Sequence, residues 1–222
     1  MKRIVFDIET AGLDLEDLDN LSQEYLLKNS KTEEEKKIVR ESLSFYPLTA
    51  EIVAIGMLDI DKDKGVVFFQ DPSKKLKVNK DDKFDFVPGN EKEILENFWK
   101  EIKDCNQFVT FNGRAFDAPF IMIRSAMHKI KPTKNLMPNR YDSNTHFDLL
   151  DRLIFYGAVQ RRFNLHMWCK AFGINSPKEE ITGHQVKDLF REGRYLDIAK
   201  YCTGDLFATR DLYLYWENFI KF

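Results

Sequence analysis

The 222-residue sequence has few cysteines, no hydrophobic run long enough to cross a membrane, and no excess of basic residues. The three cysteines are odd in number and form no Cys-x-x-Cys pair, which favours free thiols in a reducing compartment over disulfides. No second pair of ligands accompanies His166 and Cys169, which argues against a zinc site. No apolar run of signal-peptide length stands near residue 1, so we expect a cytoplasmic protein.

The near balance of charge limits the classes of partner. Lys and Arg total 34 and Asp and Glu total 36, which gives a net charge of −2. The chain therefore lacks the overall positive field of a non-specific nucleic-acid coat protein, although an enzyme with a local basic groove stays open. With 43% hydrophobic and 32% charged residues, the composition is typical of a folded protein. The length fits one large domain over residues 1–222 better than two small ones.

Hydrophobic patterning predicts an α/β fold. Helical spacing runs through 91–103, 116–127 and 196–219, and a charged helical insert is expected at about 15–45. The polar turn at 61–64 predicts a hairpin between the strands that flank it. One mixed sheet with helices on both faces is the expected architecture. The expected strands lie at 2–8, 51–60, 65–70, 107–112 and from about 145.

The first strand carries two carboxylates, Asp7 and Glu9, in the stretch "FDIET". Side chains alternate across a strand, so residues two apart share a face, and each acid raises the pKa of the other. A divalent cation such as Mg²⁺ or Mn²⁺ resolves that conflict. The alternative is that the strand ends by Asp7 and that both acids lie in solvent.

The stretch "TFNGRAFDAPF", residues 110–120, follows a buried strand and precedes a helix. It should lie at the carboxyl edge of the sheet, where ligands gather in open α/β folds. Local evidence favours Asp117 as a helix N-cap, with Pro119 in the first turn. Asn112 also fits an ordinary turn residue.

The last long helix contains "YCTGDLFATRD", in which Tyr201 and Asp205 stand four residues apart. Residues with this spacing are neighbours on one helical face. A tyrosine hydroxyl above a carboxylate can orient a metal-bound water or a phosphate oxygen. The alternative is a partly buried tyrosine beside an exposed aspartate.

Taken together and in this order, "FDIET", "NGRAFD" and "YCTGD" resemble the three exonuclease motifs of the DEDD superfamily of 3′–5′ exonucleases. Tyr-x-x-x-Asp is the pattern of its tyrosine subclass, because the histidine subclass would place His where Lys200 stands. Thr10, Asn112 and Phe116 match positions that flank the family's acids, where contacts to substrate are implied. The four acids of the family map onto Asp7, Glu9, Asp117 and Asp205.

The resemblance extends over nearly the whole chain. "HFDLLDRL", "NSPKEEITGHQV" and the charged insert look like stand-alone proteins related to the proofreading domain of family B DNA polymerases. The implied fold is ribonuclease H-like, an α/β fold with a mixed sheet of about five strands, one of them antiparallel. The implied substrates are 3′ ends of single-stranded nucleic acid, with DNA favoured over RNA, and a polymerase or repair complex is a possible partner.

The resemblance also implies a two-metal hydrolysis with Mg²⁺ or Mn²⁺ that releases nucleoside 5′-monophosphates. Asp7, Glu9 and Asp205 would hold the metal that activates water. Asp7 would bridge to the second metal, with Asp117 supporting the site partly through ordered waters. Tyr201 would position the attacking water.

Several residues near the motifs have two interpretations. Lys178 resembles a functional lysine of the related polymerase domains and could neutralise the scissile phosphate, or it could be a solvated loop residue. For Asp148 we favour a helix cap over a supporting role in the site. For Phe116 and Phe120 we favour core packing over contact with nucleotides. The basic residues within 129–134 and 160–163 could contact phosphates.

Two rival functions stay open. A ribonuclease D-type enzyme belongs to the same tyrosine subclass. Contact with a 2′-hydroxyl distinguishes RNA from DNA, and no residue of the sequence indicates such a contact. A non-catalytic nucleic-acid-binding adaptor could keep the fold, although all four acids and the tyrosine are present. A coincidence of acids in an unrelated α/β protein would require three motif matches in register.

Overall fold

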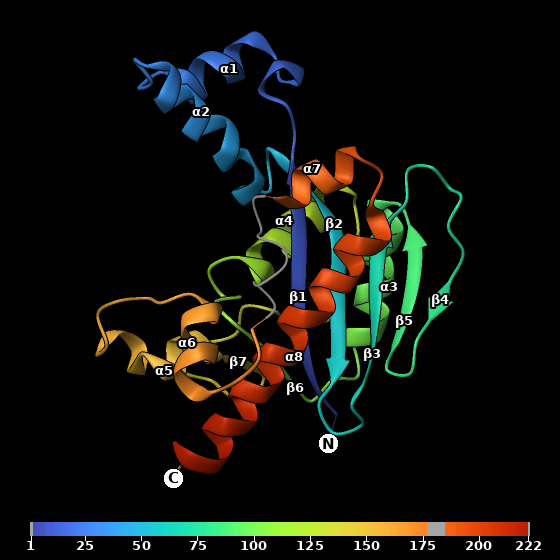
Figure 1. Cartoon of the computed structure of the whole chain (residues 1–222), viewed down its shortest axis with the longest axis vertical. Coiled ribbons are helices and arrows are strands. Elements are labelled where there is room, and N and C mark those ends of the chain that lie inside the picture. The colour runs from blue at the N-terminus through green and yellow to red at the C-terminus, as the bar shows by residue number, and fades with distance from the viewer. Residues whose placement is uncertain (1, 177–184, 222) are drawn as a thin grey trace.

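A computed structural model describes residues 2–176 and 185–221 of the chain (Figure 1). The described residues form one mixed sheet in the order β4-β5-β3-β2-β1-β6-β7, which confirms the predicted architecture. β2 and β3 form the predicted antiparallel hairpin, and β1 pairs in parallel with β6. The strands are β1 (Arg3–Gly12), β2 (Ala50–Asp59), β3 (Lys64–Gln70), β4 (Asn79–Lys80), β5 (Phe84–Gly89), β6 (Gln107–Thr110) and β7 (His146–Asp148).

The sheet has seven strands in the described residues, so the prediction of about five was too low. β5 pairs in parallel with β3, and the two-residue β4 pairs antiparallel with β5. β2 and β4 therefore run against the other strands, where one antiparallel strand was expected. Pro88 and Gly89 at the end of β5 weaken its strand signal, and β4 consists of two exposed polar residues.

The predicted insert contains two helices, α1 (Asn20–Leu27) and α2 (Glu33–Ser42). They project beyond the carboxyl end of β1, away from the sheet (Figure 1). Thr32 and Glu35 form a capping box that begins α2. Every residue of both helices is at least partly exposed, which explains the high charge of this segment.

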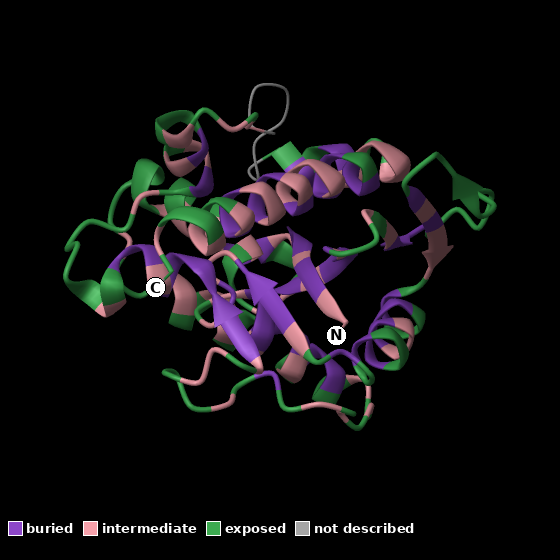
Figure 2. Ribbon diagram, turned by 90° about the horizontal axis from the view of Figure 1, so that it is seen from below, coloured by how far each residue is buried: buried purple, intermediate pink, exposed green. Residues whose placement is uncertain are grey.

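Alternation along β1 separates two hydrophobic layers. Ile4, Phe6 and Ile8 pack on the face covered by α3 (Glu91–Ile102) and α4 (Asp117–Met127). Val5 and Ala11 pack on the opposite face, which is covered by α8 (Tyr195–Phe219). The strands are largely buried between these layers (Figure 2). Asp7 and Glu9 share the parity of Val5 and Ala11 and therefore face α8.

Shorter helices complete the α8 face: α5 (Leu149–Leu153), α6 (Leu165–Phe172) and α7 (Val186–Arg191). Short 3-10 turns lie at Leu15–Asp17, Leu43–Phe45 and Phe155–Gly157. Within the described ranges no helix is both long and apolar enough to span a membrane.

Candidate active site

Asp7 and Glu9 on β1 form the centre of an acidic cluster. Ligand atoms of Asp7, Glu9 and the thiol of Cys202 all lie within 4.8 Å of one another. Glu9 is buried and Asp7 is half-buried, so the strand does not deliver both acids into open solvent. The expectation that the two carboxylates share a face of a strand is confirmed.

A glycine lets α8 lie close to these acids. Gly56 pairs with Asp7 across the β1–β2 ladder. A Cβ atom on Gly56 would lie 2.6 Å from Cys202 Sγ and 2.7 Å from a Leu206 methyl carbon, closer than real Cβ contacts. The missing side chain therefore allows the backbone of β2 to contact α8, which carries Tyr201 and Asp205.

Tyr201 is buried beside the carboxylates. Burial raises the pKa of its hydroxyl far above the usual range, and the charges of Asp205, Glu9 and Asp7 raise that pKa further. In the metal-free chain the hydroxyl therefore stays protonated at neutral pH. In this form it can act as a hydrogen-bond donor.

Asp117 joins the same site from α4. The prediction that Asp117 is an N-cap was wrong, because Phe116 holds that position and Asp117 is the first residue of the helix. The ladder between β1 and β6 ends at Val5 and Val109. Beyond it, Asp117 Oδ1 accepts a hydrogen bond of 3.1 Å from the backbone N–H of Ile8, which fixes the carboxylate next to β1.

The charge of Asp117 depends on its surroundings. Burial raises the pKa of its carboxyl to about 7, the hydrogen bonds from its own backbone N–H and that of Ile8 lower it, and Asp148 and Asp205 raise it. Without a cation nearby, Asp117 therefore takes up a proton close to neutral pH. A bound divalent cation would favour the charged form.

Asp148 holds the loop that precedes α4. Its carboxylate accepts hydrogen bonds from Leu150 and Asp151, which confirms the expected cap of α5. It also accepts hydrogen bonds from the backbone of Asn112 at 3.1 Å and of Arg114 at 2.9 Å. Asn112 adopts a φ of 65°, a left-handed conformation that Asn tolerates better than most residues. The sequence indicated the cap but not this contact across the sheet edge.

A cavity of about 340 Å³ opens beside the acids, and its lining includes Asp7, Asp205 and Asn112. Arg162 also lines this cavity, and its guanidinium donates a hydrogen bond of 2.6 Å to Asn112 Oδ1. The sequence had indicated Arg162 only as part of a basic stretch. Exposed arginines are common, so the presence of one in the short loop before α6 is only a weak indication of a binding residue.

The other residues predicted to bind substrate have different surroundings. Thr10 donates its hydroxyl hydrogen bond to Ser44 O at 2.7 Å. Phe116 is partly buried in the layer under α4, and its ring centroid lies 5.4 Å from that of Phe120. Lys178 lies outside the described residues. Of the predicted substrate contacts, the structure places Asn112 at the cavity.

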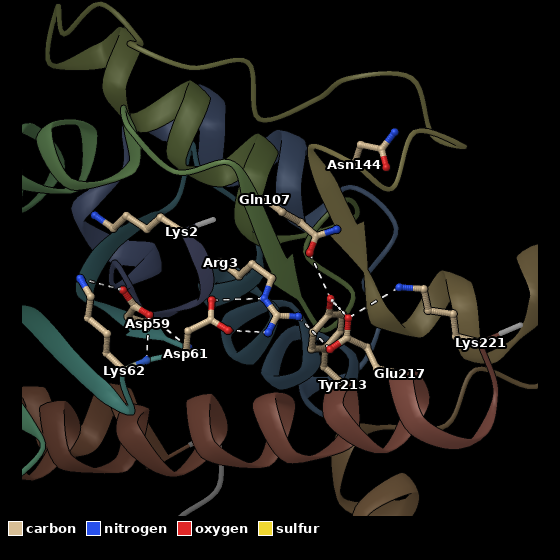
Figure 3. Close-up of a pocket in the computed structure, with 10 residues that line it drawn as sticks. All are labelled: Lys2, Arg3, Asp59, Asp61, Lys62, Gln107, Asn144, Tyr213, Glu217 and Lys221. Atoms are coloured by element: carbon tan, nitrogen blue, oxygen red, sulfur yellow. Dashed lines mark hydrogen bonds and ion pairs between the residues drawn. The ribbon is translucent and has the colours of Figure 1, made fainter.

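A larger cavity of about 790 Å³ lies at the other end of β1, near Arg3 (Figure 3). The charged side chains that line it form ion pairs with one another. Arg3 forms ion pairs with Asp61 at 2.5 Å and with Glu217 at 2.8 Å, and Lys221 and Lys62 approach Glu217 and Asp59. Because its acids are already paired with arginine and lysine, this cavity is a weaker candidate for a divalent cation than the one at Asp7.

The donors at the smaller cavity fit hard divalent cations. Asp7 and Asp205 line it, Glu9 lies beside Asp7, and Asp117 is held at the backbone of Ile8. Their carboxylate oxygens are the ligands that Mg²⁺ and Mn²⁺ prefer. Burial raises the pKa of the Cys202 thiol well above its usual range, and the charges of Asp7 and Glu9 raise it further. A thiol is also a soft ligand that Mg²⁺ and Mn²⁺ bind poorly, so the carboxylates are the fitting set.

The fold and the site define a ribonuclease H-like α/β protein with an acidic site suited to divalent cations. Residues 44–220 match the family described as "Predicted 3'-5' exonuclease related to the exonuclease domain of PolB", and the chain belongs to this family. The match includes Asn112, Asp117, Tyr201 and Asp205, whereas Asp7 and Glu9 precede it.

Similar proteins are DNA polymerases. The chain is 28% identical over 142 residues to a DNA polymerase of Pyrococcus glycovorans and 28% identical over 146 residues to one of Desulfurococcus sp. (strain Tok). These matches cover 57% and 56% of this chain, but only 18% of each polymerase.

A solved structure shares the fold. The family B DNA polymerase of the hyperthermophilic archaeon Pyrobaculum calidifontis matches with a TM-score of 0.62 and 14% identity, over 100% of this chain and 25% of that one. At this identity the likeness is one of fold. It confirms the predicted ribonuclease H-like α/β architecture.

Proposed function

We propose that the protein is a metal-dependent 3′–5′ exonuclease of the tyrosine subclass. It hydrolyses phosphodiester bonds from the 3′ end of single-stranded DNA and releases nucleoside 5′-monophosphates. One observation carries this proposal: β1, α4 and α8, which are far apart in the sequence, bring carboxylates and Tyr201 to one place. Membership of a family of predicted 3′–5′ exonucleases supports it.

Each acid has a proposed role that follows from its position. Asp7, Glu9 and Asp205 would hold one divalent cation, and Asp7 would share its carboxylate with a second. Asp117 would support the site from α4, where its hydrogen bond to Ile8 fixes its orientation. When bound, two Mg²⁺ or Mn²⁺ ions supply the Lewis acidity that activates water and stabilises the departing 3′-oxygen. Tyr201, held in its protonated form, would orient the attacking water through its hydroxyl.

DNA is the proposed substrate because the similar proteins are DNA polymerases. The proposal treats residues 1–222 as one exonuclease domain with a helical insert at about 15–45. A polymerase or repair complex that presents single-stranded 3′ ends is the proposed partner.

Digestion of matched DNA and RNA oligonucleotides tests this function. Single strands labelled at the 5′ end would be incubated with Mg²⁺, with Mn²⁺ or with a chelator, and the released products separated by chromatography. We expect a ladder that shortens from the 3′ end, nucleoside 5′-monophosphates as products, and faster digestion of DNA. Faster digestion of RNA would indicate a ribonuclease D-like enzyme. Binding without cleavage in either metal would indicate an adaptor.

A further inference from the structure

Arg162 contributes a positive charge to the acidic cavity. Asp7 and Asp205 line this cavity together with Asn112 and Arg162. Among the lining residues that the structure describes, Arg162 is the cation. The cavity therefore combines the carboxylates proposed to bind metal with one arginine from the loop before α6.

The contacts of Arg162 leave its charge largely uncompensated. Its Nη2 donates to the neutral amide oxygen of Asn112, while its Nη1 lies 3.8 Å from the carboxylate of Asp151. That carboxylate accepts shorter hydrogen bonds, of 2.6 and 2.9 Å, from Arg140. A guanidinium has five N–H donors, and the side chain of Arg162 is 44% exposed. Arg162 can therefore bind an anion without giving up a close ion pair.

Asn112 holds the guanidinium in place. Its backbone N–H donates to Asp148, a buried carboxylate that also caps α5. The chain of contacts from Asp148 through Asn112 to Arg162 connects the exposed arginine to the sheet edge. A guanidinium fixed in this way loses less entropy when it binds a ligand than a freely rotating side chain does.

We infer that Arg162 binds the phosphate of the nucleic-acid strand next to the cleaved bond on its 5′ side. The inference rests on the proposed exonuclease function, in which Asp7 and Asp205 would hold the cations that bind the cleaved phosphodiester. The neighbouring phosphate is then the anion left for the arginine in the same cavity. The planar fork of a guanidinium matches the oxygens of a phosphate.

Strand binding without metal is the first test. A fluorescent single-stranded DNA is titrated with protein in a chelator, at several salt concentrations. Arg162→Ala should weaken binding about 10-fold, as expected for loss of a hydrogen bond to a charged group, and should lower the salt slope by about 0.7. Arg162→Lys keeps the charge and should preserve the slope.

Arg161 provides a matched control. Its guanidinium lies 5.0 Å from the ring centroid of Phe163, and Arg161 does not belong to the described lining of the cavity. The Arg161→Ala protein should bind the strand with nearly the affinity of wild type. Equal losses in Arg161→Ala and Arg162→Ala would overturn the inference, because the effect would then be one of general charge. Both arginines are exposed, so thermal unfolding should show that each variant folds.

A modified substrate identifies the phosphate. One oligonucleotide carries a neutral methylphosphonate in place of the phosphate next to the cleaved bond. Wild type should bind it about 10-fold more weakly than the natural strand, whereas Arg162→Ala should bind both strands equally. The same loss in both proteins would show that Arg162 does not contact this phosphate. Because these readouts need no metal, they are independent of cleavage. A wild-type protein that binds but never cleaves with Mg²⁺ or Mn²⁺ would contradict the proposed function instead.

Discussion

Asp117 Oδ1 accepts a hydrogen bond of 3.1 Å from the backbone N–H of Ile8, the residue between Asp7 and Glu9. The contact replaces the strand pairing that β1 loses where β6 turns away. It therefore satisfies a buried backbone donor and also brings a third carboxylate to the pair on β1. One hydrogen bond thus serves both the fold and the site.

In the metal-free protein, Asp117 should contribute stability that is lost as pH rises. Its pKa is about 7 in the folded chain, against 3.8 for an exposed aspartate carboxyl. Between these values Asp117 is protonated in the folded chain and charged in the unfolded one, so its contribution to stability is lost as pH rises through this window, by about 4 kcal/mol in total. Chemical unfolding in a chelator at pH 4 to 8 measures this.

Asp117→Asn is the control for that titration, because an amide oxygen can still accept from Ile8 but does not ionise in this range. The difference in unfolding free energy between wild type and Asp117→Asn should fall with rising pH. A difference that stays flat from pH 4 to 8 would show that Asp117 is already charged in the folded chain. Saturating Mg²⁺ should reduce the slope, since a cation favours the carboxylate.

Gly56→Ala should disturb both stability and activity. The added Cβ would lie 2.6 Å from Cys202 Sγ, so α8 must move away from β2. Overpacking of this kind costs about 1–3 kcal/mol, and the shift displaces Tyr201 and Asp205 from Asp7. Gly89→Ala is a control on β5, where the nearest atoms are the Oε2 and Cβ of Glu93 at 3.1 and 3.2 Å, a milder contact than at Gly56. Equal activity in the two variants would contradict the role assigned to Gly56.

Tyr201→Phe should lower the rate of cleavage while the protein stays folded. The ring remains packed, and the hydroxyl that orients water is lost. A hydrogen bond to a charged group contributes about 1.5–3 kcal/mol, so kcat should fall about 10- to 150-fold. Because the pKa of Tyr201 is raised far above the usual range in the metal-free chain, wild type in a chelator should develop no more tyrosinate absorbance up to pH 10 than Tyr201→Phe does. An inflection near pH 10 that disappears in Tyr201→Phe would mean that the hydroxyl ionises.

Divalent cations should stabilise the folded protein through the acids of the cavity. A ligand that binds only the folded state raises the free energy of unfolding by about 2.7 kcal/mol when its concentration is 100 times its Kd. Mg²⁺ or Mn²⁺ should therefore raise the Tm of wild type, and Asp205→Asn should lose most of this increase. Asp211→Asn, further along α8, is the control and should keep it. The same increase in all three proteins would place the cation elsewhere.

The parts of the fold that follow local periodicity were predictable. The parity of Asp7 and Glu9, the hairpin of β2 and β3, and the long helix α8 follow from spacing within each segment. Residues 84–87 carry only a weak strand signal, because Pro88 and Gly89 follow them, and the pairing of β5 with β3 supplies the stability. The formation of β5 therefore depends on tertiary pairing and not on local sequence.

The site was predictable in its acids but not in its supports. Spacing placed Asp7 with Glu9 and Tyr201 with Asp205, and a resemblance joined these pairs to Asp117. The contact of Asp148 with Asn112 joins residues 36 apart, and that of Arg162 with Asn112 joins residues 50 apart. No local pattern encodes such contacts, because they depend on how β6, β7 and the loop before α6 come together.

The rate at which wild type and Asp7→Asn shorten one 5′-labelled single strand of DNA in Mg²⁺ tests whether the carboxylates of β1 carry the reaction. Asp7 lies at the centre of the acidic cluster and lines the cavity. We expect shortening from the 3′ end by wild type, its absence in a chelator, and its loss in a folded Asp7→Asn protein. A ladder that persists unchanged in Asp7→Asn would show that the carboxylates of β1 do not carry the reaction.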